Sequence, residues 1–532
     1  MTSATTTSIT GDFIVGGEAR TGAGDSVEAL DPSSGLIIGP TFRYATFKDV
    51  ADATALADSA FDDYRRTTSE ARARFLESIA DNIEALGDEL IDRASAESGL
   101  PRARLIGERG RTTGQLRLFA DVLREGSWNG ARLDPAQPDR EPLPRSDIRL
   151  RMVPLGPVVV FAASNFPLAF SVAGGDTASA LAAGCPVIVK AHDAHLGTSE
   201  LVARAVSAAV VEHDLPAGTF SILYGLGKTI GVELVTDRNV AAVGFTGSRA
   251  AGLALGRAAA GREVPIPVYA EMSSINPVIL LPGALHEKAS ELGEQFAASL
   301  TLGSGQFCTN PGLVFAVVGV ELSEFLRSAA AAVGVSTGAA MLTPGIPAAY
   351  ASGQQELRDR DDVDTVAVGQ PGTCVFQGLP ALLVTDAENF IADPALHAEV
   401  FGATSLVVRC ADIGQLFTAV KALEGQLTAT VHAAQADQAD AEKLVEILER
   451  TVGRILFNGW PTGVEVGHAM VHGGPFPATS DSRTTSVGSL AIDRFLRPVS
   501  YQDVPTPLLP SAIGDGNPDH LWRRIDGRLT QE

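Results

Sequence analysis

Three side chains along this chain could together carry out chemistry on a carbonyl group. Cys308 lies in the run Gly303 to Gly312, whose small and polar residues leave room for a substrate beside the thiol. A thiolate attacks a carbonyl carbon readily, although the run taken alone is more typical of a buried structural cysteine. Glu271 stands in a small and apolar stretch, where burial would raise the carboxyl pKa and suit a general base, although a glutamate taken alone is more commonly an ordinary surface residue. Asn165 could donate an amide hydrogen bond to an oxyanion, or could simply belong to the turn before Pro167.

A nucleotide site is predicted in the same half of the chain. Lys190 ends an apolar run, which places it at the sheet edge where parallel α/β folds bind nucleotides. The glycine turn Gly225 to Gly231 follows the next apolar run and reads GxGxxxG instead of GxGxxG, which is a weak signal. Its Gly-Lys-Thr ending is similar to a P-loop, but Ile222 stands where that motif needs its first glycine. This excludes the P-loop class of NTPase.

The elements around these residues alternate between short apolar runs and helical patterns. Such alternation is typical of a parallel sheet that is buried on both faces, and it predicts an α/β fold. One or two strands are expected in residues 1–40 and helices over residues 47–121. The first sheet is expected to contain strands at 158–161, 187–189, 220–223 and 242–245, with helices at 174–183 and 198–211. A second α/β region from about 276 to 479 has candidate strands at 278–281, 312–318, 381–384 and 405–408.

Composition and charge exclude several classes of protein. The 532 residues carry a net charge of −22, which argues against nucleic acid as a partner because phosphate backbones attract Lys and Arg. No two of the four cysteines form a CxxC pair, so we predict no metal site and no disulfide framework. The N-terminus has no secretory pattern, and the apolar runs are too short for a bilayer. A cytoplasmic protein without a membrane partner is expected.

The order of several short motifs resembles the aldehyde dehydrogenase superfamily over residues 10 to 505. In chain order, these motifs are Ser164–Asn165–Phe166–Pro167, Lys190, the glycine turn, Gly244 to Ser248, Glu271, Gln306–Phe307–Cys308 and Glu399 to Gly402. The sequence is most similar to a subgroup that contains 2-oxoglutarate semialdehyde (2,5-dioxopentanoate) dehydrogenases and a bacterial fatty-aldehyde dehydrogenase. It departs from the usual motifs in having Met272 to Ser274 after the glutamate, Ala191 after the lysine, and Ala403 after Gly402.

The resemblance implies a particular domain organisation. A Rossmann-like cofactor domain is expected over residues 1–133 and 152–275, and an α/β catalytic domain over residues 276–482. Residues 134–151 and 483–532 are expected to form a small oligomerisation arm and a C-terminal tail. Because a projecting arm exposes unpaired strand edges unless a second subunit covers them, a homodimer or homotetramer is expected.

The resemblance also implies a reaction and a cofactor. Cys308 would attack an aldehyde, Asn165 and the Cys308 N–H would hold the oxyanion, and Glu271 would activate water to hydrolyse the thioester. The presence of Glu271 disfavours transfer of the acyl group to coenzyme A.

The cofactor implied by the resemblance would be NAD or NADP. A carboxylate at Asp193 favours NAD unless it points to solvent, in which case NADP remains open. The residues expected at the cofactor are Lys190, Asp193, Gly225, Gly231, Phe245, Thr246, Gly247, Ser248, Glu399 and Phe401.

The subgroup favours 2,5-dioxopentanoate as the aldehyde, with 2-oxoglutarate as the product. A carboxylate at the far end of a substrate requires a cation, and the helix expected after Pro101 carries Arg109, Arg111 and Arg117. Their spacing lets at most one or two face the substrate, and all three could instead form surface salt bridges. His468 resembles a subgroup residue close to the nucleophile.

Two alternative functions follow from the same residues. A fatty aldehyde would require an apolar tunnel, which Phe166, Phe170 and Phe307 could line. A catalytically silent binding protein could also use this scaffold. It would have no chemical reason to combine Cys308 with Glu271 and Asn165, so an enzyme is favoured.

Overall fold

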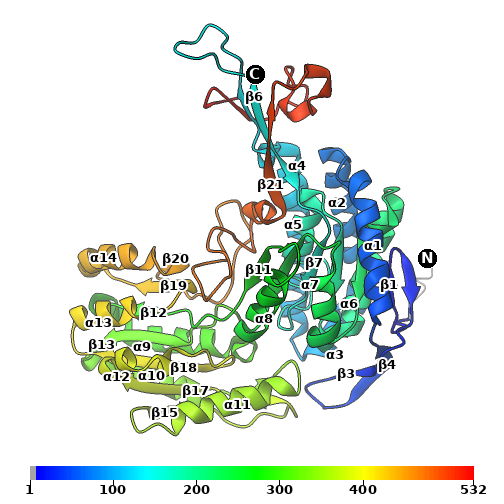
Figure 1. The fold of residues 1–532 in the computed structure, drawn as a ribbon. Helices are drawn as coiled ribbons and strands as arrows, with labels where there is room; N and C mark the ends of the chain where they lie inside the picture. Colours follow the sequence, from blue (N-terminus) through cyan, green and yellow to red (C-terminus); the bar gives the residue numbers. More distant parts are fainter. Residues whose placement is uncertain (1–7, 532) are drawn as a thin grey trace.

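The computed structural model describes residues 8–531 and contains two seven-stranded sheets and a smaller projecting sheet (Figure 1). The first sheet has the order β11-β10-β7-β8-β9-β1-β2, and its first five strands are parallel. Buried Val, Ile and Phe fill the central strands on both faces, as a parallel sheet covered by helices requires. Its strands are β1 (Phe13–Val15), β2 (Glu18–Arg20), β7 (Val158–Phe161), β8 (Val187–Lys190), β9 (Phe220–Leu223), β10 (Ala242–Thr246) and β11 (Val268–Glu271).

The helices of this first body agree with the predicted α/β alternation. The helix after Pro101 begins at Arg102 and ends before Gly126, which adopts the left-handed conformation that favours glycine. The N-terminal region contains four strands instead of one or two, because β3 (Ser26–Leu30) and β4 (Ile37–Arg43) form a separate hairpin. The helices are α1 (Phe47–Tyr64), α2 (Ser69–Ala85), α3 (Gly87–Ser98), α4 (Arg102–Glu125), α5 (Gly175–Ala183), α6 (Leu196–Glu212), α7 (Val232–Thr236) and α8 (Arg249–Ala260).

The second sheet, at the lower left of Figure 1, has the order β15-β17-β18-β13-β12-β19-β20. The four predicted strands are present, but sequence patterns missed β15, β19 and β20. In β19 every residue is buried although Gln, Thr and His alternate with apolar residues, so its composition does not reveal its burial. The strands are β12 (Val278–Leu280), β13 (Leu313–Val317), β15 (Asp364–Val368), β17 (Ala381–Asp386), β18 (Thr404–Cys410), β19 (Gln426–His432) and β20 (Val452–Phe457).

Helices also accompany the second sheet, and a two-stranded ladder lies beside it. The ladder joins β14 (Ala339–Ala340) to β16 (Gln377–Gly378). The helices are α9 (Pro282–Thr301), α10 (Val320–Val335), α11 (Gly345–Arg358), α12 (Ala387–Ala392), α13 (Ile413–Lys421) and α14 (Gln438–Leu448). Among residues 8–531 no helix is both long and apolar enough to cross a membrane.

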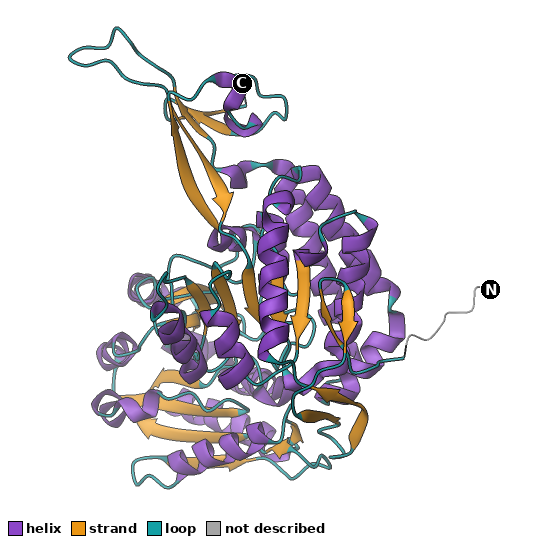
Figure 2. Cartoon of the chain, turned by 45° about the vertical axis from the view of Figure 1, so that its right-hand side comes forward, coloured by secondary structure: helices purple, strands orange, loops and turns teal. Residues whose placement is uncertain are grey.

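The third sheet projects away from both bodies (Figures 1 and 2). Its order is β21-β6-β5-β22-β23, so the C-terminal tail extends the expected hairpin. Residues 483–495 were expected in the arm, but residues 489–495 pack against α5 instead, because buried Arg494 forms an ion pair of 2.7 Å with Asp176. The strands are β5 (Arg132–Asp134), β6 (Ile148–Pro154), β21 (Leu496–Gln502), β22 (Arg523–Ile525) and β23 (Arg528–Thr530).

Candidate active site

A thiol, an imidazole and a carboxylate meet where the two bodies face each other. Cys308 Sγ lies 3.2 Å from His472 Nε2, which lies 2.9 Å from Glu271 Oε1. Glu271 is the last residue of β11, and its other oxygen accepts a hydrogen bond of 2.7 Å from Ser486. Since Nε2 carries at most one proton, it can accept from the thiol or donate to the carboxylate, but not both at once. The imidazole is therefore placed to pass a proton from Cys308 toward Glu271.

The pKa of Glu271 differs from the one predicted from the sequence. Burial alone would raise the pKa of Glu271, but the interaction with His472 and the hydrogen bonds from His472, Ser486 and Cys308 outweigh it and lower that pKa. The expected raised pKa was therefore wrong, and Glu271 is a carboxylate at neutral pH. Burial, followed by the negative charge of Glu271, raises the pKa of the Cys308 thiol well above its ordinary value. Cys308 consequently holds its proton in this arrangement, and its attack on an aldehyde requires that proton to leave.

His472 is a residue that the sequence interpretation missed, and it replaces His468. The expected His468 is exposed, and its backbone carbonyl accepts a hydrogen bond from Ser489. His472 is 2% exposed, and its backbone N–H donates to Thr485. The two histidines lie four residues apart in a segment without helix or strand, so no periodic pattern indicates which one points inward.

Cys308 lies on a tight loop whose backbone is held by hydrogen bonds from other residues. Asn276 Nδ2 donates to the carbonyl oxygens of Cys308 and Asn310, both at 2.9 Å. A Cβ atom added to Gly305 would lie 2.3 Å from the backbone N of Ala403, so only glycine allows the two loops to approach this closely.

Two donors suited to an oxyanion lie beside Cys308. The Asn165 amide, which is 8% exposed, donates one N–H to Gln306 O at 3.1 Å and keeps a second N–H available. In the part of the chain that the structure describes, the backbone N–H of Cys308 has no acceptor. The site thus brings together all three residues that the sequence predicted for catalysis.

A cavity of about 510 Å³ runs from Cys308 and Glu271 to the ends of β8 and β10. It is lined by the predicted cofactor residues Lys190, Asp193, Phe245, Thr246, Gly247, Ser248, Glu399 and Phe401. Gly225 and Gly231 do not line it. They pack against Ile230 and Phe161, and Gly227 lines the cavity instead, because the turn forms a wide helical loop from Gly227 to Gly231.

The chemistry of this cavity fits a dinucleotide. Ser248 caps the N-terminus of α8, where free N–H groups and the helix dipole favour a pyrophosphate. Lys190 is buried, and among residues 8–531 its one charged partner is Asp193, at 4.0 Å, which leaves its donors for ribose hydroxyls. Tyr44, which no motif indicated, donates to Asp193 Oδ2 at 3.0 Å.

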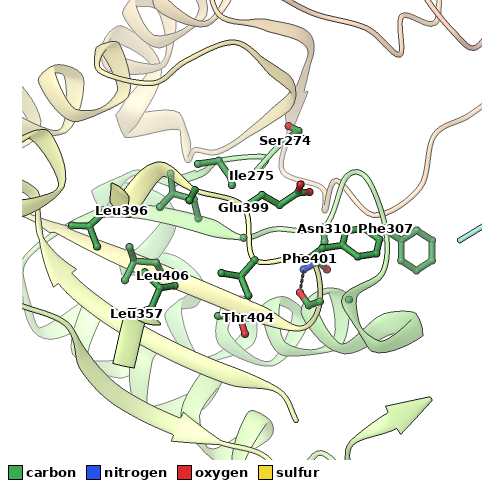
Figure 3. Close-up of a pocket in the computed structure, with 16 residues that line it drawn as sticks. Ser274, Ile275, Phe307, Asn310, Leu357, Leu396, Glu399, Phe401, Thr404 and Leu406 are labelled. Atoms are coloured by element: carbon green, nitrogen blue, oxygen red, sulfur yellow. Dashed lines mark hydrogen bonds between the residues drawn. The ribbon is translucent and has the colours of Figure 1, made fainter. Parts of the chain in front are cut away.

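Glu399 lies in a smaller pocket that joins this cavity, near Ser274 and Phe401 (Figure 3). Burial raises the pKa of Glu399 to about 8, and a hydrogen bond from the backbone of Ser274 limits the rise. At neutral pH the carboxyl is therefore largely protonated and can both donate to and accept from a ribose hydroxyl.

Phe166, Phe170 and Phe307, the last of which directly precedes Cys308, pack into an aromatic wall. The guanidinium of Arg111 lies over this wall, 5.7 Å from the Phe166 ring centroid and 5.2 Å from that of Phe170. Its Nε and Nη2 are buried, and among the described residues Arg111 has no hydrogen bond or ion pair. Burial lowers the pKa of Arg111, and the charges of Cys308 and Glu108 oppose that shift.

The other two candidate arginines, Arg109 and Arg117, do not join the site. Arg109 was expected beside the substrate, but it points to the opposite face of the helix and donates to Gly87 O at 2.8 Å. Arg117 forms surface ion pairs with Glu84 and Asp81. The helical spacing limited how many arginines could face the substrate, but only the packing of α4 identified Arg111.

The geometry agrees with what comparison with known proteins finds. A sequence profile of the aldehyde dehydrogenase family matches residues 20–475. The chain belongs to the aldehyde dehydrogenase family. This dehydrogenase is 56% identical over 521 residues to the alpha-ketoglutaric semialdehyde dehydrogenase 2 of Azospirillum brasilense, covering 98% of this chain and 99% of the relative. It is 45% identical over 522 residues to the alpha-ketoglutaric semialdehyde dehydrogenase of Acinetobacter baylyi, with the same coverage of 98% and 99%.

Solved structures support the same fold. The betaine aldehyde dehydrogenase of Staphylococcus aureus, solved in complex with NAD⁺, superposes with a TM-score of 0.80 at 18% identity, covering 93% of this chain and 96% of that chain. The predicted family, the aldehyde dehydrogenase fold and the classification as an oxidoreductase are therefore confirmed. As a member of this family, the enzyme oxidises an aldehyde with NAD(P).

Proposed function

We propose that this aldehyde dehydrogenase oxidises 2-oxoglutarate semialdehyde (2,5-dioxopentanoate) to 2-oxoglutarate. The observation that carries this proposal is Arg111, whose largely buried guanidinium lies over Phe166 and Phe170 and has no hydrogen bond or ion pair among the described residues. Burying a charge without a partner costs several kcal/mol, whereas a carboxylate can pair with a guanidinium through two parallel hydrogen bonds. The names of the two full-length relatives support the same substrate.

The proposed reaction assigns one step to each residue of the cluster. Cys308 transfers its proton to His472 and attacks the aldehyde carbon, while the Asn165 amide and the Cys308 N–H stabilise the oxyanion. Lys190, Ser248 and Glu399 would hold NAD(P), which would supply the hydride acceptor for oxidation of the adduct to a thioester. Glu271 then takes a proton from water, and the water oxygen attacks the thioester carbon. The carbon–sulfur bond breaks, His472 returns its proton to the Cys308 sulfur, and the acid is released.

A fatty or other uncharged aldehyde is the alternative substrate, and the aromatic wall favours it. Phe166, Phe170 and Phe307 form an apolar cluster with Val487, which would accommodate a hydrocarbon chain. The position of Arg111 argues against this alternative, because the chain would cover an unpaired cation and remove it further from water.

Replacing Arg111 with methionine is expected to lower kcat/KM for 2,5-dioxopentanoate by about 100-fold, mainly through KM. The loss of charge-assisted hydrogen bonds to a carboxylate is of this order. With hexanal the same variant is expected to equal or exceed the wild type, because the cation no longer faces the apolar chain. Steady-state kinetics with both aldehydes measures this difference.

Arg109→Ala is the matched control, since Arg109 belongs to the same helix but points away from the site. It is expected to leave both substrates unaffected. If decanal outperforms 2,5-dioxopentanoate in the wild type and Arg111→Met does not weaken the acid substrate, the fatty-aldehyde alternative is correct.

We propose further that the enzyme prefers NAD to NADP. Asp193 lines the cavity, and the hydrogen bond from Tyr44 holds its carboxylate in place beside Lys190. A carboxylate there accepts hydrogen bonds from ribose hydroxyls and repels a 2′-phosphate. The nearby Lys190 favours a phosphate, so the preference depends on Asp193.

Asp193→Ser is expected to raise the ratio of kcat/KM with NADP to kcat/KM with NAD by about 10-fold, since a repulsion of this kind costs of the order of 1 kcal/mol. Tyr44→Phe is expected to shift the ratio in the same direction by less, because the carboxylate remains. A wild type that already prefers NADP would show that Asp193 does not discriminate.

We also propose a homodimer or a pair of dimers as the assembly. Beside the projecting sheet, two leucines are exposed in the single chain: Leu143, in the loop between β5 and β6, is 69% accessible, and Leu508, in the turn after β21, is 71% accessible. A projecting sheet with exposed leucines and an unpaired edge is typical of a surface that a second subunit covers.

A further inference from the structure

Arg104, in the first turn of α4, contacts both loops that carry the catalytic residues. Its Nη2 donates a hydrogen bond of 2.7 Å to the backbone carbonyl of Asn165. Its guanidinium also lies over two aromatic rings, 4.5 Å from the centroid of Phe307 and 5.1 Å from that of Phe166. Phe307 directly precedes Cys308, and Phe166 directly follows Asn165. The Arg104 side chain therefore contacts the sequence neighbours of both Cys308 and Asn165.

The two loops belong to different bodies of the molecule. Asn165 follows β7 of the first sheet, whereas Cys308 precedes β13 of the second. Arg104 also closely approaches the backbone before the nucleophile, because a Cβ atom added to Gly303 would lie 2.6 Å from Arg104 Nη1. The guanidinium therefore bridges the junction at which the reaction takes place.

We propose that Arg104 is a positioning residue that sets the distance between the Asn165 amide and Cys308, and thereby assembles the oxyanion site. The amide of Asn165 also donates to Gln306 O at 3.1 Å, so its orientation depends on how closely the two loops approach. Donors stabilise an oxyanion only within about 2.7–3.1 Å of it, and a displacement of about 1 Å can reduce the rate by about 100-fold. This inference rests on the oxyanion role proposed above for Asn165.

The unsatisfied polar atoms of Arg104 argue against a purely space-filling role. Within residues 8–531 its buried Nη1 has no hydrogen bond, and the carboxylate that pairs with it, on Glu108, lies 4.0 Å from Nε. That carboxylate is engaged elsewhere, since its other oxygen accepts hydrogen bonds from the backbone N–H groups of Leu168 and Ala169. A methionine or leucine would fill the same space without burying an incompletely paired cation. Unlike those side chains, the guanidinium donates a hydrogen bond to the backbone carbonyl of Asn165.

Arg104 and Arg111 thus differ in what they contact. Arg111 touches aromatic rings and no backbone carbonyl, so its effect should depend on the charge of the substrate. Arg104 holds the backbone of a catalytic residue, so its effect should be the same for every aldehyde.

The test compares Arg104→Met with Arg111→Met, using 2,5-dioxopentanoate and hexanal. Arg104→Met is expected to lower kcat by about 50-fold for both aldehydes and to change KM by less than about threefold. The variant still binds the substrate, but its oxyanion site stabilises the transition state less well. Arg104→Lys is expected to recover part of the rate, since an ammonium can donate to Asn165 O but lacks the planar guanidinium. Fluorescence titration with NADH should give the same Kd for all variants.

A double-mutant cycle with Asn165→Ala separates positioning from a general structural effect. If Arg104 acts through the Asn165 amide, the double variant is expected to be no slower than Asn165→Ala alone. Losses that multiply would overturn the proposal, as would a loss confined to 2,5-dioxopentanoate, which would make Arg104 a carboxylate ligand. Should Arg104→Met fail to fold, the same cycle is run with Arg104→Lys. A wild type that prefers hexanal would refute the proposed substrate and leave this test intact, because the cycle can be measured with hexanal alone.

Discussion

Replacing Cys308 with alanine is expected to abolish aldehyde oxidation, with kcat reduced by about 10⁴-fold or more. Without the thiol no covalent adduct forms, and removal of a nucleophile typically costs a factor of this order. Binding of NADH is expected to be unchanged, because the thiol contributes little to the 510 Å³ cavity that would hold the dinucleotide. NAD(P)H formation at 340 nm, together with NADH titration, measures both.

The other cysteines provide matched controls for this variant. Cys185 and Cys410 are buried in the two main hydrophobic cores, and Cys374 lies outside the active-site cavity. Alanine at any of these three positions is expected to preserve kcat. Substantial turnover by Cys308→Ala, or loss of turnover in one of the controls, would show that Cys308 is not the nucleophile.

Replacing Glu271 with glutamine is expected to separate the two halves of the reaction. Glutamine can keep a hydrogen bond to Ser486 but cannot accept a proton from water, and loss of a general base typically costs about 10²–10⁴-fold. The first turnover should therefore release a burst of reduced cofactor, followed by slow hydrolysis of the thioester. Stopped-flow absorbance resolves the two phases.

The same variant should change the reactivity of the nucleophile. The charge of Glu271 helps to raise the pKa of Cys308, so its removal lowers that pKa and increases the thiolate fraction at pH 7. Alkylation of Cys308 by iodoacetamide at pH 7 is accordingly expected to be faster in Glu271→Gln than in the wild type. Equal rates in both catalytic phases would show that another residue, His472 being the nearest, serves as the base.

Ser486→Ala is the control for disturbance of the cluster. It removes one hydrogen bond to Glu271 and leaves the carboxylate in place. We expect a smaller loss of kcat without a burst, because hydrolysis still has its base.

The sequence alone predicted much of the fold, because the information was local. Continuous apolar runs identified the buried parallel strands β7 to β10, since strands covered on both faces tolerate few polar residues. Where burial and composition disagree, as in β19, the pattern failed. The three residues proposed for catalysis could also be brought together from the sequence, because each lies in a short motif whose order along the chain is specific.

Other properties of the site depend on residues that are distant in sequence, so only the tertiary structure reveals them. The pKa of Glu271 is lowered because His472, 201 positions later, lies beside it, and no local pattern around Glu271 indicates this. Helical spacing showed that the arginines of α4 divide between faces, but the packing of that helix determined that Arg104 and Arg111 face the site while Arg109 does not. Periodicity specifies relative orientation within one element, whereas the position of that element depends on contacts across the whole chain.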